Sequence, residues 1–248
     1  MAGKQNGKRW VTLQDGLDNL KLEDAPPPPS TPGADEVLVE IKAVSLNYRD
    51  TEGNHPPLSI SNTKFRSDTN SLQVAMGAYN HHSSMPASQP ALVPCSDACG
   101  IVVSVGPDLE VPWKVGDRVL STFNQSHLTG QIRAADMASG LGKPLDGVLQ
   151  SYRVFPSRGL VRCPDYLSDE EGACLPIAAV TAWMAVNGFR PLGRPGGRGE
   201  TVLLLGTGGV AVAGLQIAKA AGARSESYFF FFFLTSTVVT LDVSGLGC

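Results

Sequence analysis

A glycine-rich turn late in the chain has the residue types and the spacing of a phosphate-binding loop. Six consecutive residues fit the pattern G-x-G-x-x-G/A: Gly206, Thr207, Gly208, Gly209, Val210 and Ala211. In such a turn the first glycine permits a tight bend, the second lets the backbone approach a pyrophosphate, and a small last residue lets helix and strand pack closely. The pattern therefore predicts that these residues bind a dinucleotide. A glycine-rich turn without a ligand is the alternative.

The segments around this turn predict alternating strands and helices. Residues 200–205 form an apolar run typical of a central strand in a parallel sheet. Residues 210–221 predict a helix that begins at the turn and ends before Gly222. Residues 176–187 predict a buried helix ending at Gly188, and a loop rich in Gly and Pro separates it from the strand.

The N-terminal two thirds of the chain predict mainly β-structure. Residues 36–44 alternate apolar and polar side chains, as half-buried strands do. Three shorter runs, at 100–106, 117–121 and 147–155, have a similar character and are bounded by Gly, Pro and Asp. The proline-rich residues 26–33 are expected to form a stiff, extended connector.

Composition narrows the class of partner. The chain has 248 residues, of which 42% are hydrophobic and 17% charged, as in ordinary globular proteins. With 20 Lys and Arg against 23 Asp and Glu, it lacks the basic surface of a nucleic-acid binder. No apolar run reaches the roughly 18 residues that cross a membrane. These features predict a cytoplasmic protein that acts on a small-molecule substrate, binds neither nucleic acid nor membrane, and keeps its cysteines reduced and mostly buried.

Several segments follow one another in the order seen in a known superfamily. They are Asp-Glu-Val-Leu-Val at 35–39, Ser-Leu-Asn-Tyr-Arg-Asp at 45–50, Val-Pro-Cys-Ser-Asp-Ala-Cys-Gly at 93–100, Val-Gly-Asp-Arg-Val at 115–119, Leu-Pro at 175–176, Thr-Ala-Trp at 181–183, and the glycine turn. Over residues 10–224 the chain thus resembles the medium-chain dehydrogenase/reductase superfamily, which includes zinc alcohol dehydrogenases, quinone reductases and enoyl reductases.

The resemblance implies an α/β fold class with a largely β N-terminal domain. Residues 10–165 would form a GroES-like β-barrel domain. Residues 166–224 would form a linker helix and the first βα unit of a Rossmann nucleotide-binding domain, and residues 225–248 would be an aberrant tail.

Two positions in this alignment argue against zinc. The zinc alcohol dehydrogenases have a Cys ligand where this chain has Asn47 and a His ligand where it has Ser96, and neither replacement is a good zinc ligand. Cys95 and Cys99 have no second pair nearby that would complete a structural zinc site. The chain is therefore expected to bind no metal and to resemble the zinc-independent branch.

The resemblance also implies roles for individual residues. Asn47 and Tyr48 would line the nicotinamide pocket, Asp50 would orient their loop, Tyr79 would donate a proton to substrate, and Thr181 would touch the nicotinamide. For the two tyrosines, an ordinary half-buried aromatic is the alternative. The chemistry would be hydride transfer from NADP or NAD, with NADP preferred, to a carbonyl, quinone or activated alkene.

Two segments depart from the superfamily pattern. A complete six-stranded nucleotide domain needs about 130 to 150 residues, far more than follow residue 200. The expected second strand is replaced by Ser-Glu-Ser-Tyr and five phenylalanines, and neither Glu226 nor Asp242 is well placed to hold a ribose. The tail from 225 is therefore interpreted as read-through or as a mis-predicted gene model, and residues 53–73 suggest either a retained intron or a surface insertion.

The leading hypothesis is an NAD(P)-dependent, zinc-free oxidoreductase of this superfamily, C-terminally truncated and crippled by the truncation. Whether the chain is an active enzyme stays open. A homodimer is expected only for a full-length form. The alternatives are a zinc-type alcohol dehydrogenase and a non-catalytic GroES-like interaction module.

Overall fold

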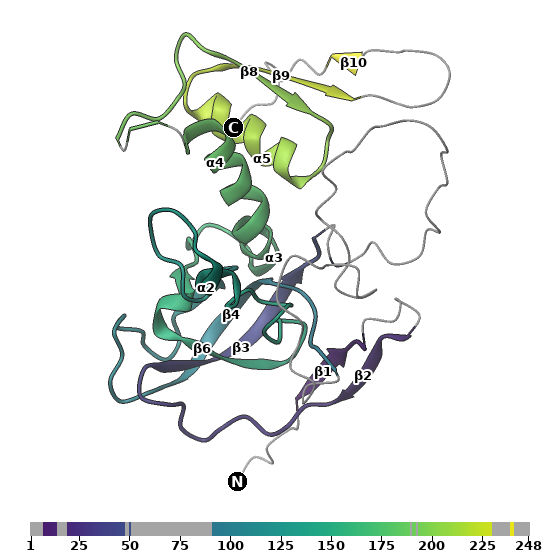
Figure 1. Cartoon of the computed structure of the whole chain (residues 1–248), viewed down its shortest axis with the longest axis vertical. Helices are drawn as coiled ribbons and strands as arrows, with labels where there is room; N and C mark the ends of the chain where they lie inside the picture. The colour runs from purple at the N-terminus through teal and green to yellow at the C-terminus, as the bar shows by residue number, and fades with distance from the viewer. Residues whose placement is uncertain are drawn as a thin grey trace. The chain divides into compact units, whose positions relative to one another are not determined.

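The chain folds into two compact units, Met1–Pro176 and Ile177–Cys248. The first is largely β and the second is α/β (Figure 1), which confirms the fold class predicted from the sequence. The computed structural model describes residues 7–13, 19–47, 50, 91–188, 190–191, 193–229 and 239–240.

An antiparallel sheet with strand order β6-β3-β4-β5-β7 organises the first unit. Its strands are β3 (Glu36–Ser45), β4 (Asp97–Val105), β5 (Arg118–Ser121), β6 (Tyr152–Pro156) and β7 (Leu160–Arg162). All four strands predicted in this region form. The pairing of β3 with β4 shifts register at Leu38/Val39 and again at Ile41/Ala43. Such irregularities bend a sheet, so the strands can curl around a core.

The core of the first unit follows from the alternation along β3. Val37 and Val39 are inaccessible to solvent, and they pack with residues from β4, β5 and β6. Trp113 joins this cluster from a loop, and its indole Nε1 donates a hydrogen bond of 2.7 Å to the carbonyl of Ser157. The one polar atom of the Trp113 side chain therefore has a hydrogen-bond partner within this apolar core.

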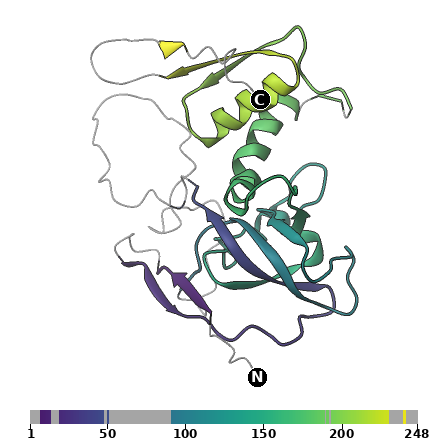
Figure 2. The ribbon, with the colours of Figure 1, turned by 180° about the vertical axis from the view of Figure 1, so that it is seen from behind.

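A hairpin of β1 (Lys8–Val11) and β2 (Lys21–Asp24) was not predicted. Each strand has four residues, which is too short for an alternation to stand out. The backbone of β1 also pairs with the segment before β6, because Trp10 N donates to the carbonyl of Leu149. The hairpin thus lies beside the five-stranded sheet (Figures 1 and 2).

Short helices complete the first unit: α2 (Ala134–Met137), the 3-10 turn η2 (Ser157–Gly159) and α3 (Asp169–Ala173). Helix α3 begins with a capping box, in which Ser168 accepts from the backbone of Glu171 and the Glu171 side chain accepts from the backbone of Ser168. A π-helical turn, η3 (Leu175–Ala179), follows it.

The second unit is built from α4 (Val180–Asn187), β8 (Thr201–Leu205), α5 (Gly209–Ala220), β9 (Arg224–Phe229) and β10 (Val239–Thr240). Strands β8 and β9 are parallel and are joined by α5, which makes a βαβ unit. The prediction that the expected second strand is replaced is therefore wrong, because β9 forms; that residues 225–248 are an aberrant tail stays a prediction. The polar residues of β9 do not form a strand pattern in the sequence. Its backbone N–H and C=O groups nevertheless form hydrogen bonds with β8.

The second unit also corrects two predictions of burial. The helix predicted at 176–187 forms as η3 and α4, but only Ala182 of α4 is buried and Trp183 is 50% exposed. In β8, Leu203 and Leu205 are exposed, although an apolar run predicted a strand covered on both faces. Helix α5 packs against β8 and β9 in both views (Figures 1 and 2). The described residues supply no second layer for the other face.

None of the described helices is both long and apolar enough to cross a membrane.

Candidate functional site

The glycine turn lies where the sequence places it, between β8 and α5. Gly206 has φ of +87°, in the left-handed region that glycine tolerates best, so the chain can reverse directly after the strand. Gly208 is the N-cap of α5 and has an extended backbone, with φ −75° and ψ 175°. A Cβ built on Gly208 meets no atom within 4 Å. The backbone is therefore open to a ligand at this point.

The first turn of α5 is suited to an anion. No side chain caps this helix, and its first turn contains no acidic residue. The first backbone N–H groups of an α-helix lack intrahelical partners and carry the positive end of the helix dipole. In α5 these groups belong to Gly209, Val210 and Ala211, three of the predicted cofactor residues. The turn therefore fits the pyrophosphate of a dinucleotide.

Small residues hold α5 close to the strand. Ala211 is buried, as its predicted packing role requires. Gly214 was not predicted, yet a Cβ there would lie 2.9 Å from the Cδ2 atom of Leu204 on β8. The helix can approach the strand this closely only because residue 214 lacks a side chain. Its spacing of one helical turn from Ala211 was the available signal.

The carboxyl end of β9 lies beside the carboxyl end of β8, since Leu205 pairs with Tyr228. In dinucleotide-binding folds an acidic residue after the second strand holds the adenosine ribose. Glu226 pairs with Leu203 in the middle of the strand rather than at this end, and Asp242 lies outside the described residues. The described part of β9 thus ends without a carboxylate.

A second group of predicted residues gathers at one end of the first unit's sheet. Ser45 of β3 pairs with Asp97 of β4, so the residues just after β3 lie near those that begin β4. The backbone N–H of Asn47 donates to Asp50 Oδ2 at 2.9 Å, and the N–H of Asp50 donates to the carbonyl of Asn47 at 2.8 Å. Asp50 therefore fixes the backbone of Asn47, while its role in orienting a nicotinamide-binding loop stays a prediction.

The backbone of Asn47 is hydrogen-bonded to Asp50, but its side-chain amide is not. Its Nδ2 atom is buried and has no hydrogen-bond partner within the part of the chain that the structure describes. A buried donor without a partner costs about 1–3 kcal/mol. A folded protein keeps few such groups, and each calls for a physical reason.

A buried polar cluster where β4 begins and β5 ends was not predicted as part of the site. Ser96 Oγ donates to Asp97 Oδ1 at 2.6 Å, and Ser121 Oγ donates to the carbonyl of Ser96 at 2.7 Å. All three residues are almost inaccessible to solvent. Cys95, which precedes them, has φ of +68°, a strained backbone for a residue with a side chain. The polar pair Ser-Asp at the start of an apolar strand was the signal for this cluster.

These residues do not fit a catalytic zinc ion. Zinc selects thiolate, imidazole and carboxylate ligands, whereas Asn47 offers a carboxamide and Ser96 a hydroxyl that is already bonded to Asp97. Among the described residues, no three His, Cys, Asp or Glu side chains are grouped so that they could hold a metal ion.

The other predicted site residues belong to a different unit or lie outside the described residues. Thr181 is an exposed residue of α4, in the second unit, whereas Asn47 and Asp50 belong to the first. Tyr48 and Tyr79 lie outside the described residues. The roles assigned to these residues stay predictions.

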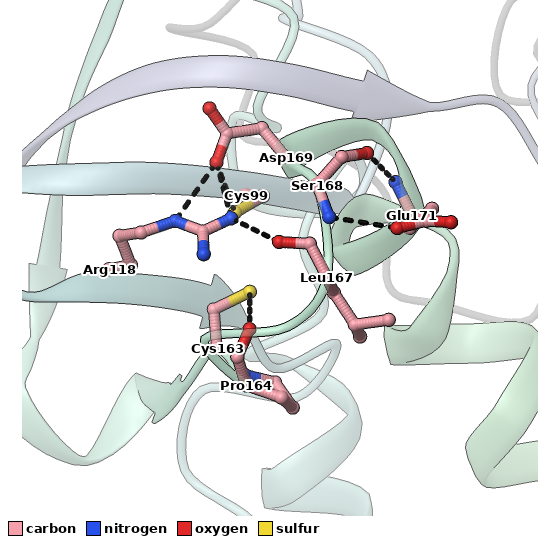
Figure 3. Close-up of polar contacts among 8 residues, drawn as sticks. All are labelled: Cys99, Arg118, Cys163, Pro164, Leu167, Ser168, Asp169 and Glu171. Atoms are coloured by element: carbon pink, nitrogen blue, oxygen red, sulfur yellow. Dashed lines mark hydrogen bonds and ion pairs between the residues drawn. The ribbon is translucent and has the colours of Figure 1, made fainter.

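A thiol cluster in the first unit is structural (Figure 3). Arg118 of β5 donates from Nη2 to Asp169 Oδ1 at 2.7 Å and to the carbonyl of Leu167 at 2.9 Å. These bonds tie the start of α3 to the sheet, and Asp169 raises the pKa of Arg118. Cys99 Sγ donates to the same carboxylate oxygen at 3.5 Å. The ion pair therefore anchors α3.

Both cysteines of this cluster are buried. A Cβ at Gly172 of α3 would lie 2.9 Å from Cys163 Sγ and 3.5 Å from Cys99 Sγ, so the thiols pack tightly against the helix. Burial, followed by the nearby Cys163 and Asp169, raises the pKa of Cys99 to about 12. Cys99 therefore stays a neutral thiol at neutral pH and is a poor nucleophile.

A curled antiparallel β unit followed by a nucleotide-binding βαβ unit defines the medium-chain dehydrogenase/reductase class. Residues 33–165, more than half of the chain, match the alcohol dehydrogenase GroES-like domain, and the chain belongs to this family.

Relatives support this assignment. The chain is 40% identical over 210 residues to a zinc-type alcohol dehydrogenase-like protein of Schizosaccharomyces pombe, which covers 84% of this chain and 51% of that protein. Among solved structures, it is similar to a putative alcohol dehydrogenase from Sinorhizobium meliloti 1021, with TM-score 0.66, 33% identity, and 89% of this chain and 56% of that one covered. An NAD-dependent alcohol dehydrogenase gives TM-score 0.63 and 30% identity, with 89% and 57% covered. The chain thus spans about half the length of these relatives.

Proposed function

We propose that the chain is an NAD(P)-dependent oxidoreductase that reduces a carbonyl, quinone or activated alkene without a catalytic zinc. One observation carries the proposal: the open glycine turn at the start of α5, set between two parallel strands. The similarity to an NAD-dependent alcohol dehydrogenase supports the same class of cofactor. When bound, such a cofactor supplies the hydride.

The turn and its surroundings would hold the cofactor. The backbone at Gly208 and the first N–H groups of α5 would contact the pyrophosphate, and Thr181 would contact the nicotinamide. NADP is preferred to NAD because the described end of β9 lacks the carboxylate that would hold a free ribose 2′-hydroxyl and repel a 2′-phosphate.

The end of the first unit's sheet would hold the substrate. Asp50 fixes the backbone of Asn47 through two hydrogen bonds, so the Asn47 side chain projects from a defined point. Tyr48 would line the pocket and Tyr79 would donate the proton that completes the reduction, as the family resemblance implies. The substrate is a small molecule, and the reaction takes place in the cytoplasm.

We expect the 248-residue chain by itself to bind the cofactor weakly and to turn over slowly. Leu203 and Leu205 of β8 are exposed, so the strand that leads into the turn has apolar cover on only one face. Such a strand is weakly held and prone to association. A homodimer belongs to the proposal only for a longer form of the protein.

Fluorescence titration with NADPH and NADH tests the cofactor site. The decisive variant is Gly208→Asp, because its extended backbone suits a capping aspartate and its Cβ has free space. The variant should fold at least as well as the parent, yet lose binding by about tenfold or more, since a carboxylate would repel the pyrophosphate.

Gln216→Glu is the matched control, because it adds the same charge at an exposed position further along α5. It should bind as the parent does. Equal binding by the parent and by Gly208→Asp would contradict the proposed cofactor site. The same samples, supplied with NADPH and with enones or quinones, report turnover.

A further inference from the structure

Asn47 has a buried side-chain hydrogen-bond donor from which no described residue accepts. Its Nδ2 atom is buried and makes no hydrogen bond within the described residues, although it lies at the polar end of the sheet. The loop does not need this amide, because Asp50 already bonds the backbone N–H of Asn47 and donates to its carbonyl.

The neighbouring polar groups are engaged with one another. The Ser96 hydroxyl donates to Asp97, and the Ser121 hydroxyl accepts from the backbone N–H of Ala98 and donates to the carbonyl of Ser96. The two hydroxyl groups are therefore hydrogen-bonded to Asp97 and to the backbone of β4 and the residue before it. Ser45, two residues before Asn47, pairs with Asp97 of this cluster, and the Asn47 amide has no acceptor among the described residues.

We propose that the Asn47 side-chain amide donates a hydrogen bond to the reacting oxygen of the substrate, in the role that a zinc ion has in metal-dependent relatives. The inference rests on the proposed function. A carbonyl or quinone oxygen accepts a hydrogen bond in the ground state and gains negative charge as it is reduced, so a fixed N–H donor stabilises the transition state more than the substrate. The ligand class is a small carbonyl compound or quinone.

At this buried position a neutral amide is a better hydrogen-bond donor than a charged side chain would be. Its N–H group polarises the oxygen without bringing a charge that the buried surroundings must solvate. Because no described residue accepts from this donor, the substrate oxygen would displace none of the hydrogen bonds that the structure describes. Removing a single donor of this kind typically lowers kcat by about 10²–10³-fold.

The test uses a push–pull aldehyde, 4-dimethylaminocinnamaldehyde, whose absorption moves to longer wavelength when its oxygen accepts a strong hydrogen bond. Added to the intact chain after treatment with a chelator, it should bind with such a shift. Asn47→Asp keeps the size of the side chain and removes both N–H donors, and Asn47→Leu removes all polarity. Both variants should lose the shift.

Two controls separate a role in polarising the substrate from a role in folding. Asn187→Asp makes the same chemical change in α4, where the Asn187 Oδ1 atom accepts from Gly196 N and an aspartate can accept equally well. It should leave the shift unchanged. Asn47→Leu should unfold at the same temperature as the parent or higher, because it removes an unsatisfied buried donor. A lower unfolding temperature would show that the amide supports the fold and would overturn the proposal.

The remaining outcomes are equally decisive. A shift that survives in both Asn47 variants, a shift that the chelator abolishes, or an aldehyde that fails to bind each overturns the proposal. None of these measurements requires NADPH. If the aldehyde shift behaves as expected while the NADPH titration fails, the proposed function fails and the assignment of Asn47 as a carbonyl-oxygen donor stands.

Discussion

The two units differ in how completely their apolar strands are covered. In the first unit, β3 lies between β4 and β6, and Val37 and Val39 are inaccessible to solvent. In the second, β8 has an equally apolar sequence, yet Leu205 is 71% exposed within the described structure. Main-chain pairing is enough to form a strand in both places, but burial depends on the elements that face it. Stability should therefore be concentrated in the first unit.

The largest expected effect is that of a side chain at Gly147. A Cβ there would lie 2.0 Å from the carbonyl oxygen of Cys95 and 2.3 Å from that of Pro94, and backbone atoms cannot give way cheaply. Gly147→Ala should destabilise the first unit by about 4 kcal/mol or prevent its folding. Gly208→Ala, in the open turn of the second unit, should change the unfolding free energy by about 0.5 kcal/mol or less. Urea titrations followed by circular dichroism measure both unfolding free energies. Similar losses of stability in the two variants would contradict the difference between the two units.

Truncation of a leucine in each unit sharpens the same contrast. Leu141 belongs to the first unit's core and is fully buried, so Leu141→Ala should cost about 2–5 kcal/mol. Leu205→Ala should cost about 0.5 kcal/mol or less and should leave more of the chain in solution at high concentration. Thermal unfolding and light scattering provide the readouts. A large loss from Leu205→Ala would mean that other residues cover it.

A smaller effect should appear as a dependence of stability on pH. Burial raises the pKa of Cys99 from 9.0 to about 12, so above pH 9 the thiol ionises in the unfolded chain but not in the folded one. The unfolded state gains from this ionisation, and stability should fall between pH 9 and pH 12. One pH unit above 9 changes the unfolding equilibrium by at most about tenfold. Cys99→Ala should remove this part of the slope in parallel urea titrations at pH 8 and pH 10. An identical slope in the variant would rule out Cys99 as its source.

The elements that could be predicted from the sequence are those marked by a short pattern of neighbouring residues. The alternation along residues 36–44 predicted β3, and the glycine turn predicted the start of α5. The strands of the β1–β2 hairpin escaped because four residues show no period.

The rest depends on neighbours that a linear sequence does not display. Strand β9 forms by pairing with β8, and nothing in its own polar residues indicates this. Ser96, Asp97 and Ser121 become one cluster only when β4 and β5 pair, so their hydrogen bonds follow from register rather than from spacing. Of the predicted site, Asn47 and Asp50 are joined by hydrogen bonds, while the part that Tyr48 and Tyr79 would supply stays a prediction.

The smallest expected effect is that of removing metal, which should change neither stability nor cofactor binding. The turn in the second unit relies on backbone N–H groups, and the end of the sheet in the first relies on Asn47 and on Ser96, whose hydroxyl is bonded to Asp97. Among the described residues, neither the turn nor the end of the sheet groups thiolate or imidazole donors such as zinc selects. Purified chain should carry zinc well below one ion per molecule by elemental analysis.

A chelator should also leave the unfolding temperature and the NADPH titration unchanged. Zinc held by folded protein stabilises the fold by its binding free energy, so a bound ion could not be removed without lowering the unfolding temperature. One zinc per chain, together with a lower unfolding temperature after chelation, would place this chain among the zinc-type enzymes. Because the described donors could not hold such an ion, its ligands would then have to come from residues such as His55, His81 and His82, outside the described part of the chain.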